Sequence, residues 1–240
     1  MRKNVVTMIR SLFAVIALSG MVGCGDGNGT SGNPTPVGIP VDLSKFASIF
    51  KGVPGSVPQS FPSLQGSDPQ GNLLSGSLSM TPGAQIIVLD DGTSCYSSAT
   101  ATTLSQNNST LVTENITKYF KVSDGSFYRM VAVSDRGSTT YVRTSADSFP
   151  HGGVKVGDSG NLGVFQGSDG TTLFIEWAVN PDFNGGTVFV ISEQFYSSGM
   201  GMTSETHSYY LDAEGNLTKF AFRINISEGT YQVSGAVSGP

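Results

Sequence analysis

Few side chains of this sequence could act as a nucleophile or a base at neutral pH. Beyond the N-terminal region the chain has one cysteine, Cys95, and two histidines, His151 and His207. A catalytic thiol needs a nearby base that activates it, and both histidines lie far from Cys95 in the sequence. A lone cysteine is more commonly a small buried hydrophobe, and we expect this role for Cys95.

The two histidines are predicted to lie outside any site. His207 belongs to the segment 205–210 (ETHSYY), a predicted strand, and we expect its side chain on the solvent-facing side of that strand. His151 follows a proline and precedes two glycines, which indicates a loop. Because two histidines cannot form an all-histidine catalytic zinc site, the sequence predicts no metal centre of that kind.

Three acidic segments could offer oxygen ligands to calcium, namely residues 90–92, 158–161 and 182–185. None has the full calcium-binding loop with its closing glutamate, and Asp, Asn and Gly are also ordinary turn residues. The sequence contains no nucleophile elbow, phosphate-binding loop, zinc-ligand spacing or paired-cysteine motif. We therefore expect no cofactor, no metal and no enzymatic activity, with a Ser/His/Asp hydrolase as the third alternative.

The N-terminus has the three parts of a secretory signal peptide. Arginine and lysine come first, an unbroken apolar run follows at 12–18, and small residues lead to Cys24. The run is too short to span a bilayer as a helix. The last four residues, Met21-Val22-Gly23-Cys24, resemble the lipobox of bacterial lipoproteins, with Met21 where leucine is usual. The resemblance implies that residues 1–23 are removed and that Cys24 receives acyl chains such as palmitate.

Acylation of Cys24 would anchor the chain in a membrane of the bacterial cell envelope. The expected membrane is the outer one, at its periplasmic or its surface face. The alternative is an ordinary signal peptide that is cleaved near Gly23. If Cys24 carries lipid, Cys95 has no disulfide partner within the chain, since these are the two cysteines of the sequence.

The segment 24–40 is predicted to be a flexible tether. After Cys24 it reads GDGNGTSGNPTPVGIP, which is rich in Gly and Pro and has no apolar periodicity. Such a segment reaches about 20–25 Å on average. Of the 13 Lys and Arg, three precede Cys24, so the mature chain keeps 10 against 18 Asp and Glu, a net charge of −8. This charge excludes nucleic acid as a partner and argues against direct electrostatic binding to anionic lipid.

Residues 41–240 are predicted to form a single β-rich domain with one short helix. Apolar residues recur on one helical face across 42–52, where Asp42 can cap the start and Gly52 the end. From Leu73 onward, apolar and polar residues alternate with a period of two. The clearest expected inward faces are Leu173-Ile175-Trp177-Val179, Phe220-Phe222-Ile224-Ile226 and Tyr231-Val233-Val237.

Glycine-containing turns separate the predicted strands, at 124–125, 134–137, 169–170, 212–216 and 228–229. Strand and turn units of this length favour an antiparallel meander. We therefore expect an all-β fold with a curved antiparallel sheet or a β-barrel, and a β-sandwich is the alternative.

Three classes of function are compatible with these features. The first is an envelope lipoprotein that serves as a binding or accessory module and meets other envelope proteins. The second is a carrier of an apolar ligand such as a lipid, and the third is the hydrolase. A helix beside a curved antiparallel sheet is similar to the half-barrel of periplasmic lipoprotein carriers. The tripeptide Gly-Asn-Leu recurs at Gly71, Gly160 and Gly215, where it indicates one kind of turn used three times. The lipobox, the tether and these turns resemble uncharacterised proteobacterial lipoproteins, which implies no activity.

Overall fold

The computed structural model describes residues 38–134, 137–145, 149–150, 153–182, 186–197, 202–226 and 229–238. The elements in this part of the chain are β1 (Pro40–Val41), α2 (Ser44–Lys51), β2 (Gln59–Ser67), β3 (Leu73–Pro82), β4 (Ile87–Val88), β5 (Ser94–Gln106), β6 (Ser109–Lys121), β7 (Phe127–Ser134), β8 (Gly137–Arg143), β9 (Val154–Lys155), β10 (Ser159–Gly167), β11 (Thr172–Pro181), β12 (Thr187–Tyr196), β13 (Met202–Leu211), β14 (Leu217–Ile226) and β15 (Gly229–Ala236). The predicted signal peptide, Cys24 and His151 lie outside the described residues, so the predictions made for them stay predictions.

Twelve antiparallel strands close into a barrel. Along the chain, each strand of the ring pairs with the next one, from β2 round to β15. The ring closes because β15 pairs with β2. Strand β4 pairs with β5 over two residues and lies outside the ring. The predicted all-β fold with a curved or barrel-like antiparallel meander is therefore confirmed.

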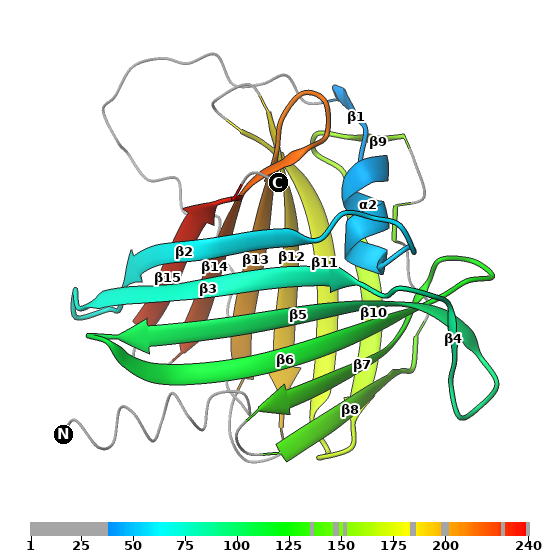
Figure 1. The fold of residues 1–240 in the computed structure, drawn as a ribbon, viewed down its shortest axis with the longest axis horizontal. Coiled ribbons are helices and arrows are strands. Elements are labelled where there is room, and N and C mark those ends of the chain that lie inside the picture. The colour runs from blue at the N-terminus through cyan, green and yellow to red at the C-terminus, as the bar shows by residue number, and fades with distance from the viewer. Residues whose placement is uncertain are drawn as a thin grey trace.

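Two short ladders divide the barrel into halves. The pairings β8–β10 and β15–β2 each comprise three described residue pairs. The other neighbours in the ring pair over six to twelve described residues. One half therefore contains β2, β3 and β5 to β8, and the other contains β10 to β15. Figure 1 shows the strands of the first half running across those of the second half behind them.

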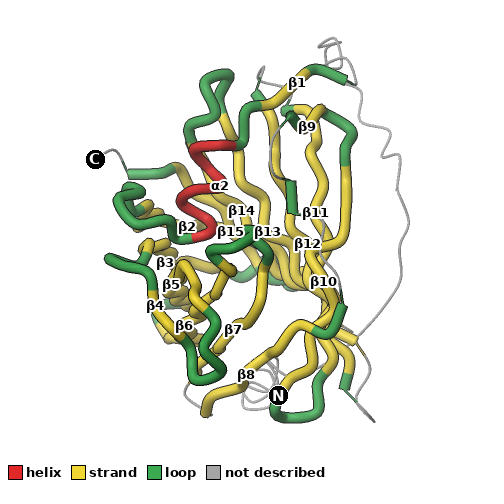
Figure 2. The backbone as a smooth tube through the Cα atoms, turned by 90° about the vertical axis from the view of Figure 1, so that its right-hand side faces the viewer, coloured by secondary structure: helices red, strands yellow, loops and turns green. Residues whose placement is uncertain are grey.

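Helix α2 lies across one end of the barrel, beside the small β1–β9 ladder (Figure 2). The N-cap position is Leu43, not Asp42 as the sequence predicts, but Asp42 still accepts a hydrogen bond from the backbone N–H of Ser44, the first residue of the helix, at 2.8 Å. Its end is Gly52, at φ +75°, and a Cβ atom there would overlap the carbonyl oxygen of Ser97 on β5. Glycine is required at this position both for its left-handed backbone and for its close contact with the sheet.

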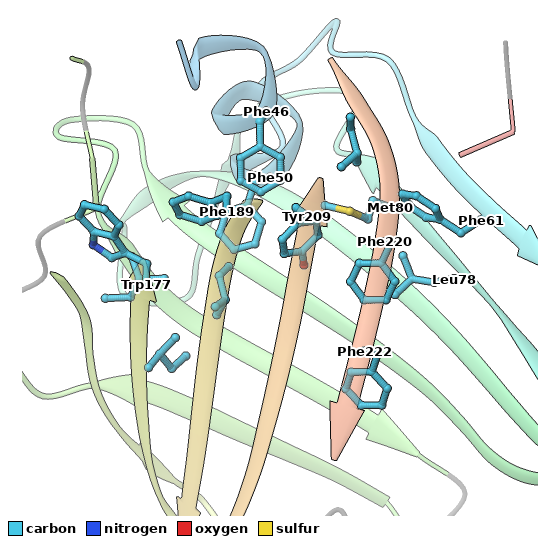
Figure 3. Packing of buried hydrophobic residues seen from close by; sticks show 14 of the residues in the cluster. Phe46, Phe50, Phe61, Leu78, Met80, Trp177, Phe189, Tyr209, Phe220 and Phe222 are labelled. Carbon is cyan, nitrogen blue, oxygen red and sulfur yellow. The ribbon is translucent and has the colours of Figure 1, made fainter. Parts of the chain in front are cut away.

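Two phenylalanines of α2 fill this end of the barrel with aromatic packing. Phe46 packs against Phe189 at 5.1 Å and Tyr209 at 4.9 Å between ring centroids. Phe50 contacts Phe120 of the opposite half at 5.6 Å. Figure 3 shows Phe46 and Phe50 pointing from the helix toward the rings on β12 and β13. Because rings from both halves meet under α2, the helix closes this end of the barrel.

The inward faces predicted from alternation are buried where the structure describes their side chains, except that Val237 is only partly buried. The face Leu173-Ile175-Trp177-Val179 is buried, as are Phe220, Phe222 and Ile224, while Arg223 between them is exposed. The turn at 212–216 also forms as predicted. Asp212 N–H donates to the Asn216 carbonyl at 3.0 Å, and Gly215 has φ +75°.

Candidate functional site

Five ionisable side chains face the interior of the barrel, and we call them the interior polar cluster. Glu193 lies on β12, and Glu205 and His207 lie on β13, while Glu114 and Lys118 come from β6 in the opposite half. All five are buried. The register explains their meeting, because Glu193 is paired directly with Glu205 and His207 follows two residues later on the same face.

Two close contacts join charged groups within the cluster. Lys118 Nζ lies 4.0 Å from Glu193 Oε1, so this pair bridges the two halves of the barrel. His207 Nε2 lies 3.6 Å from Glu205 Oε2. One ligand atom each from Glu193, Glu205 and His207 lies within 4.8 Å of the others, which makes them a candidate set of metal ligands.

Burial controls the protonation of the cluster. It raises the pKa of Glu205 to about 7, with Lys118 opposing the change, and it lowers the pKa of His207 to about 4. Burial also raises the pKa of Glu114 well above its ordinary value, and the neighbouring carboxylates Glu205 and Glu193 add to this. Burial lowers the pKa of Lys118, while those carboxylates oppose it. At neutral pH His207 is therefore uncharged.

Two polar atoms on the inward face of β13 lack a hydrogen-bond partner among the described residues. They are His207 Nε2 and the hydroxyl oxygen of Thr203. Thr203 is fully buried, and His207 is 8% exposed. A buried polar atom left without a partner costs about 1–3 kcal/mol, so these two atoms favour contact with a polar group in the interior.

The cluster lies directly beneath the aromatic layer that α2 completes. Lys118 Nζ is 4.7 Å from the centre of the Phe50 ring, a cation–π contact between the cluster and the helix. The His207 ring meets the Phe222 ring edge-on at 5.0 Å. One side of the interior polar cluster is therefore lined by apolar aromatic rings.

The interior away from α2 is less completely filled. Near the helix, the inward side chains Phe61, Phe120 and Phe220 are 0% exposed. Farther from α2, 6–8% of the surface stays exposed on inward side chains of β5, β6, β14 and β15, namely Leu104, Val112, Glu114, Phe222, Ile224 and Tyr231. Thr102, Ile116 and Ala132, which share that inward face by register, are only half-buried. Solvent therefore reaches apolar interior surface beside the interior polar cluster.

The predicted solvent-facing position of His207 is wrong. Along β13, the face that contains His207 and the opposite face with Ser204, Thr206 and Ser208 are both largely polar, so alternation alone did not identify the inward one. Neither Glu193 nor Lys118 was singled out, although each lies between inward apolar residues at a spacing of two. The signal that could have found them is a charge on an otherwise apolar strand face.

Cys95 is a free, fully buried cysteine on β5, as predicted. Burial raises the pKa of its thiol, which makes the thiolate scarce and the group unreactive. The acidic segment at 90–92 is used within the fold, because Asp90 pairs with Arg129 at 2.8 Å and Asp91 accepts a hydrogen bond from the Tyr128 hydroxyl. Asp158 accepts a hydrogen bond from the Lys155 backbone, while residues 183–185 lie outside the described part of the chain.

A separate groove of about 720 Å³ lies outside the barrel, next to α2. It is bounded by the outer side of the helix, by residues 55–60, by the turn at 215–217 and by residues 237–238. It contains one charged side chain, Lys45, which already donates hydrogen bonds to the Glu214 carbonyl and to Asn216 Oδ1, each at 3.0 Å. The groove therefore offers fewer specific contacts than the barrel interior.

Comparisons of the chain with protein-family models, with curated proteins and with solved structures find no match. Within the described ranges, no helix has the length and apolar character needed to cross a membrane.

Proposed function

We propose that this chain is a lipid-anchored binding protein of the bacterial cell envelope, with the barrel interior as its binding compartment. Acylated Cys24 would hold it at the membrane, and the tether of residues 24–40 would let the barrel reach ligands near the surface. The ligand that we propose is an apolar molecule, such as a lipid or a free acyl chain, with one polar group.

The uneven filling of the barrel is the observation that carries this proposal. A core that serves stability alone is packed densely throughout, because unfilled volume costs stability. Here Phe46 and Phe50 of α2 and the Phe189 ring beneath them are 0–1% exposed, whereas the inward apolar side chains Val112, Ile224 and Tyr231, which lie farther from the helix, are 6–8% exposed. We infer that this part of the interior, away from α2, accommodates an occupant.

The interior polar cluster defines where the polar group of such a ligand would lie. Burial raises the pKa of Glu205 to about 7, so near neutral pH this carboxyl group can donate as well as accept hydrogen bonds, and burial shifts the pKa of Glu114 in the same direction. The accessible apolar walls adjoin this cluster, and an amphipathic molecule would match both surfaces. Pockets of this kind typically combine apolar walls with a few polar groups that fix the ligand's orientation.

A titration of the mature chain tests the proposal. The protein would begin at position 24 with Cys24→Ser, and it would be titrated with lauric acid and with phosphatidylethanolamine. Fluorescence of Trp177, which stacks on Phe189 at 5.9 Å, and the thermal midpoint are followed together. Saturable changes in both are expected, because a ligand that binds only the folded state stabilises it. No change with either lipid would favour the accessory role, in which outer surfaces contact other envelope proteins.

A further inference from the structure

The interior polar cluster contains more negative than positive groups. It has three carboxyl groups, from Glu114, Glu193 and Glu205, and one ammonium group, from Lys118. If all four ionise, the net charge inside the barrel is −2. Unbalanced charge in a protein interior is costly, and it is usually neutralised by pairing, by protonation or by a metal ion. A single divalent cation would balance this cluster.

Three of the inward groups are arranged as ligands to such a cation. The atoms that Glu193, Glu205 and His207 would offer lie within 4.8 Å of one another, and His207 Nε2 and Glu205 Oε2 are 3.6 Å apart. Ligand bonds of about 2.0–2.1 Å to a tetrahedral Zn²⁺ place two ligand atoms roughly 3.4 Å apart. Small side-chain rotations would therefore bring all three ligand atoms within bonding distance of one ion.

An independent observation points to a ligand at the same place. His207 Nε2 has no hydrogen-bond partner among the described residues, although the side chain is about nine-tenths buried and this atom faces Glu205. Histidine binds metals through the ring nitrogen that does not carry the proton, and Nε2 can take this role when the proton is on Nδ1. The charge of the cluster and the free nitrogen are thus both satisfied by the same kind of ligand.

We propose that Glu193, Glu205 and His207 bind one divalent transition-metal ion of the Zn²⁺ class inside the barrel. The set of one imidazole and two carboxylates suits Zn²⁺ better than Ca²⁺ or Mg²⁺, which prefer oxygen ligands alone. Three protein ligands leave a fourth position, as in zinc sites that also bind water or a small molecule. Lys118, which lies near Glu193 without metal, would then be paired mainly with Glu114. This site goes beyond the proposed apolar-ligand function and does not depend on it.

The test measures Zn²⁺ binding by calorimetry with the chelator-treated mature chain that carries Cys24→Ser. One Zn²⁺ per chain is expected, and Co²⁺ in its place should give the strong visible absorption of a four-coordinate site. Glu193→Gln, Glu205→Gln and His207→Gln should each weaken binding at least tenfold, since even losing an outer partner of a ligand typically costs about 10–100-fold. The matched control is Glu176→Gln, an exposed, outward-facing carboxylate on β11 that should leave binding unchanged.

Circular dichroism separates loss of the site from loss of the fold. The Glu205→Gln variant keeps the side-chain shape and removes a poorly compensated buried charge, so it should fold even if Glu193→Gln, which removes the partner of the buried Lys118, or His207→Gln does not. A folded wild-type barrel that binds no Zn²⁺ would overturn the proposal. Equal binding by the wild type and by folded Glu205→Gln would overturn it as well. Lipid titration of the same samples reports separately on the proposed apolar-ligand function.

Discussion

Replacing Glu205 by glutamine should stabilise the metal-free protein at mildly alkaline pH. Glutamine has nearly the shape of the protonated glutamate but cannot ionise. Glu205 is buried and faces Glu193 in the register, while the amino group of Lys118 lies 4.0 Å from Glu193. An ionised Glu205 is therefore a poorly compensated charge in the folded chain, and removing it should increase the free energy of unfolding.

The magnitude follows from the pKa of Glu205, which burial raises from 4.5 to about 7. Below about pH 4.5 the carboxyl is protonated in both states, so its ionisation costs no stability. Between pH 4.5 and about pH 7 the unfolded chain releases the proton of Glu205 while the folded chain keeps it, so stability falls as pH rises. Because each pKa unit corresponds to about 1.4 kcal/mol, the full loss above pH 7 is about 3 kcal/mol. The variant escapes this loss.

The assay is urea unfolding in the presence of a chelator, at about pH 4.5 and about pH 8, for the wild type and Glu205→Gln. The advantage of the variant should grow by about 3 kcal/mol between the two conditions. The pKa of His207 is lowered to about 4, which makes the stability of both proteins rise with pH. This contribution is present in the wild type and in the variant, so it largely cancels when the two are compared. Glu176→Gln is the control, with no such change. If the difference in unfolding free energy between Glu205→Gln and the wild type does not depend on pH, the inference that Glu205 is a buried, poorly compensated carboxylate is wrong.

Three further predictions concern the core, the helix end and the anchor. Phe222→Ala should cost about 3–5 kcal/mol of unfolding free energy in urea titrations, whereas the exposed neighbour change Arg223→Ala should cost less than ~1 kcal/mol; equal losses would place the inward face of β14 wrongly. Gly52→Ala should destabilise the fold by about 1 kcal/mol or more, because the residue has a left-handed backbone and a Cβ atom would overlap Ser97 on β5; an unchanged thermal midpoint would contradict this contact. In the full-length precursor, Cys24→Ser should move the protein from the membrane to the soluble fraction; equal membrane retention of variant and wild type would remove the lipid anchor from the account.

Local features of the fold were predictable because they depend on neighbouring residues. The helix at 44–51 follows from its apolar spacing, with Asp42 and Gly52 at its ends, and the turn at 212–216 follows from its Asp and Gly. Closure of the ring of strands could not be predicted from neighbouring residues. It depends on the pairing of β15 with β2, whose residues are far apart in the sequence and meet over three pairs. Alternation gives the face of a strand but not its distant partner.

The interior polar cluster was not predictable for a related reason. Its members come from β6, β12 and β13, and the register of a closed barrel is what brings Lys118 within 4.0 Å of Glu193. On β13 both faces are largely polar, so His207 could be assigned to the solvent side from sequence alone. Glu193 and Lys118 follow an apolar alternation as if they were core residues. Charges on inward positions are therefore the pattern that sequence reasoning should examine first in such strands.

The most direct test of the barrel interior as a binding compartment is to fill it. The test variant is Ala132→Leu, because Ala132 is half-buried on the inward face of β7. The matched control is Val133→Leu, because Val133 faces outward and is 43% exposed in the wild type. The thermal midpoint of each folded protein is measured with increasing lauric acid. We predict that the wild type and Val133→Leu are stabilised saturably, and that Ala132→Leu requires at least about tenfold more ligand for the same shift, the equivalent of about 1.4 kcal/mol. Equal stabilisation of all three proteins would place the ligand outside the barrel and contradict the proposed function.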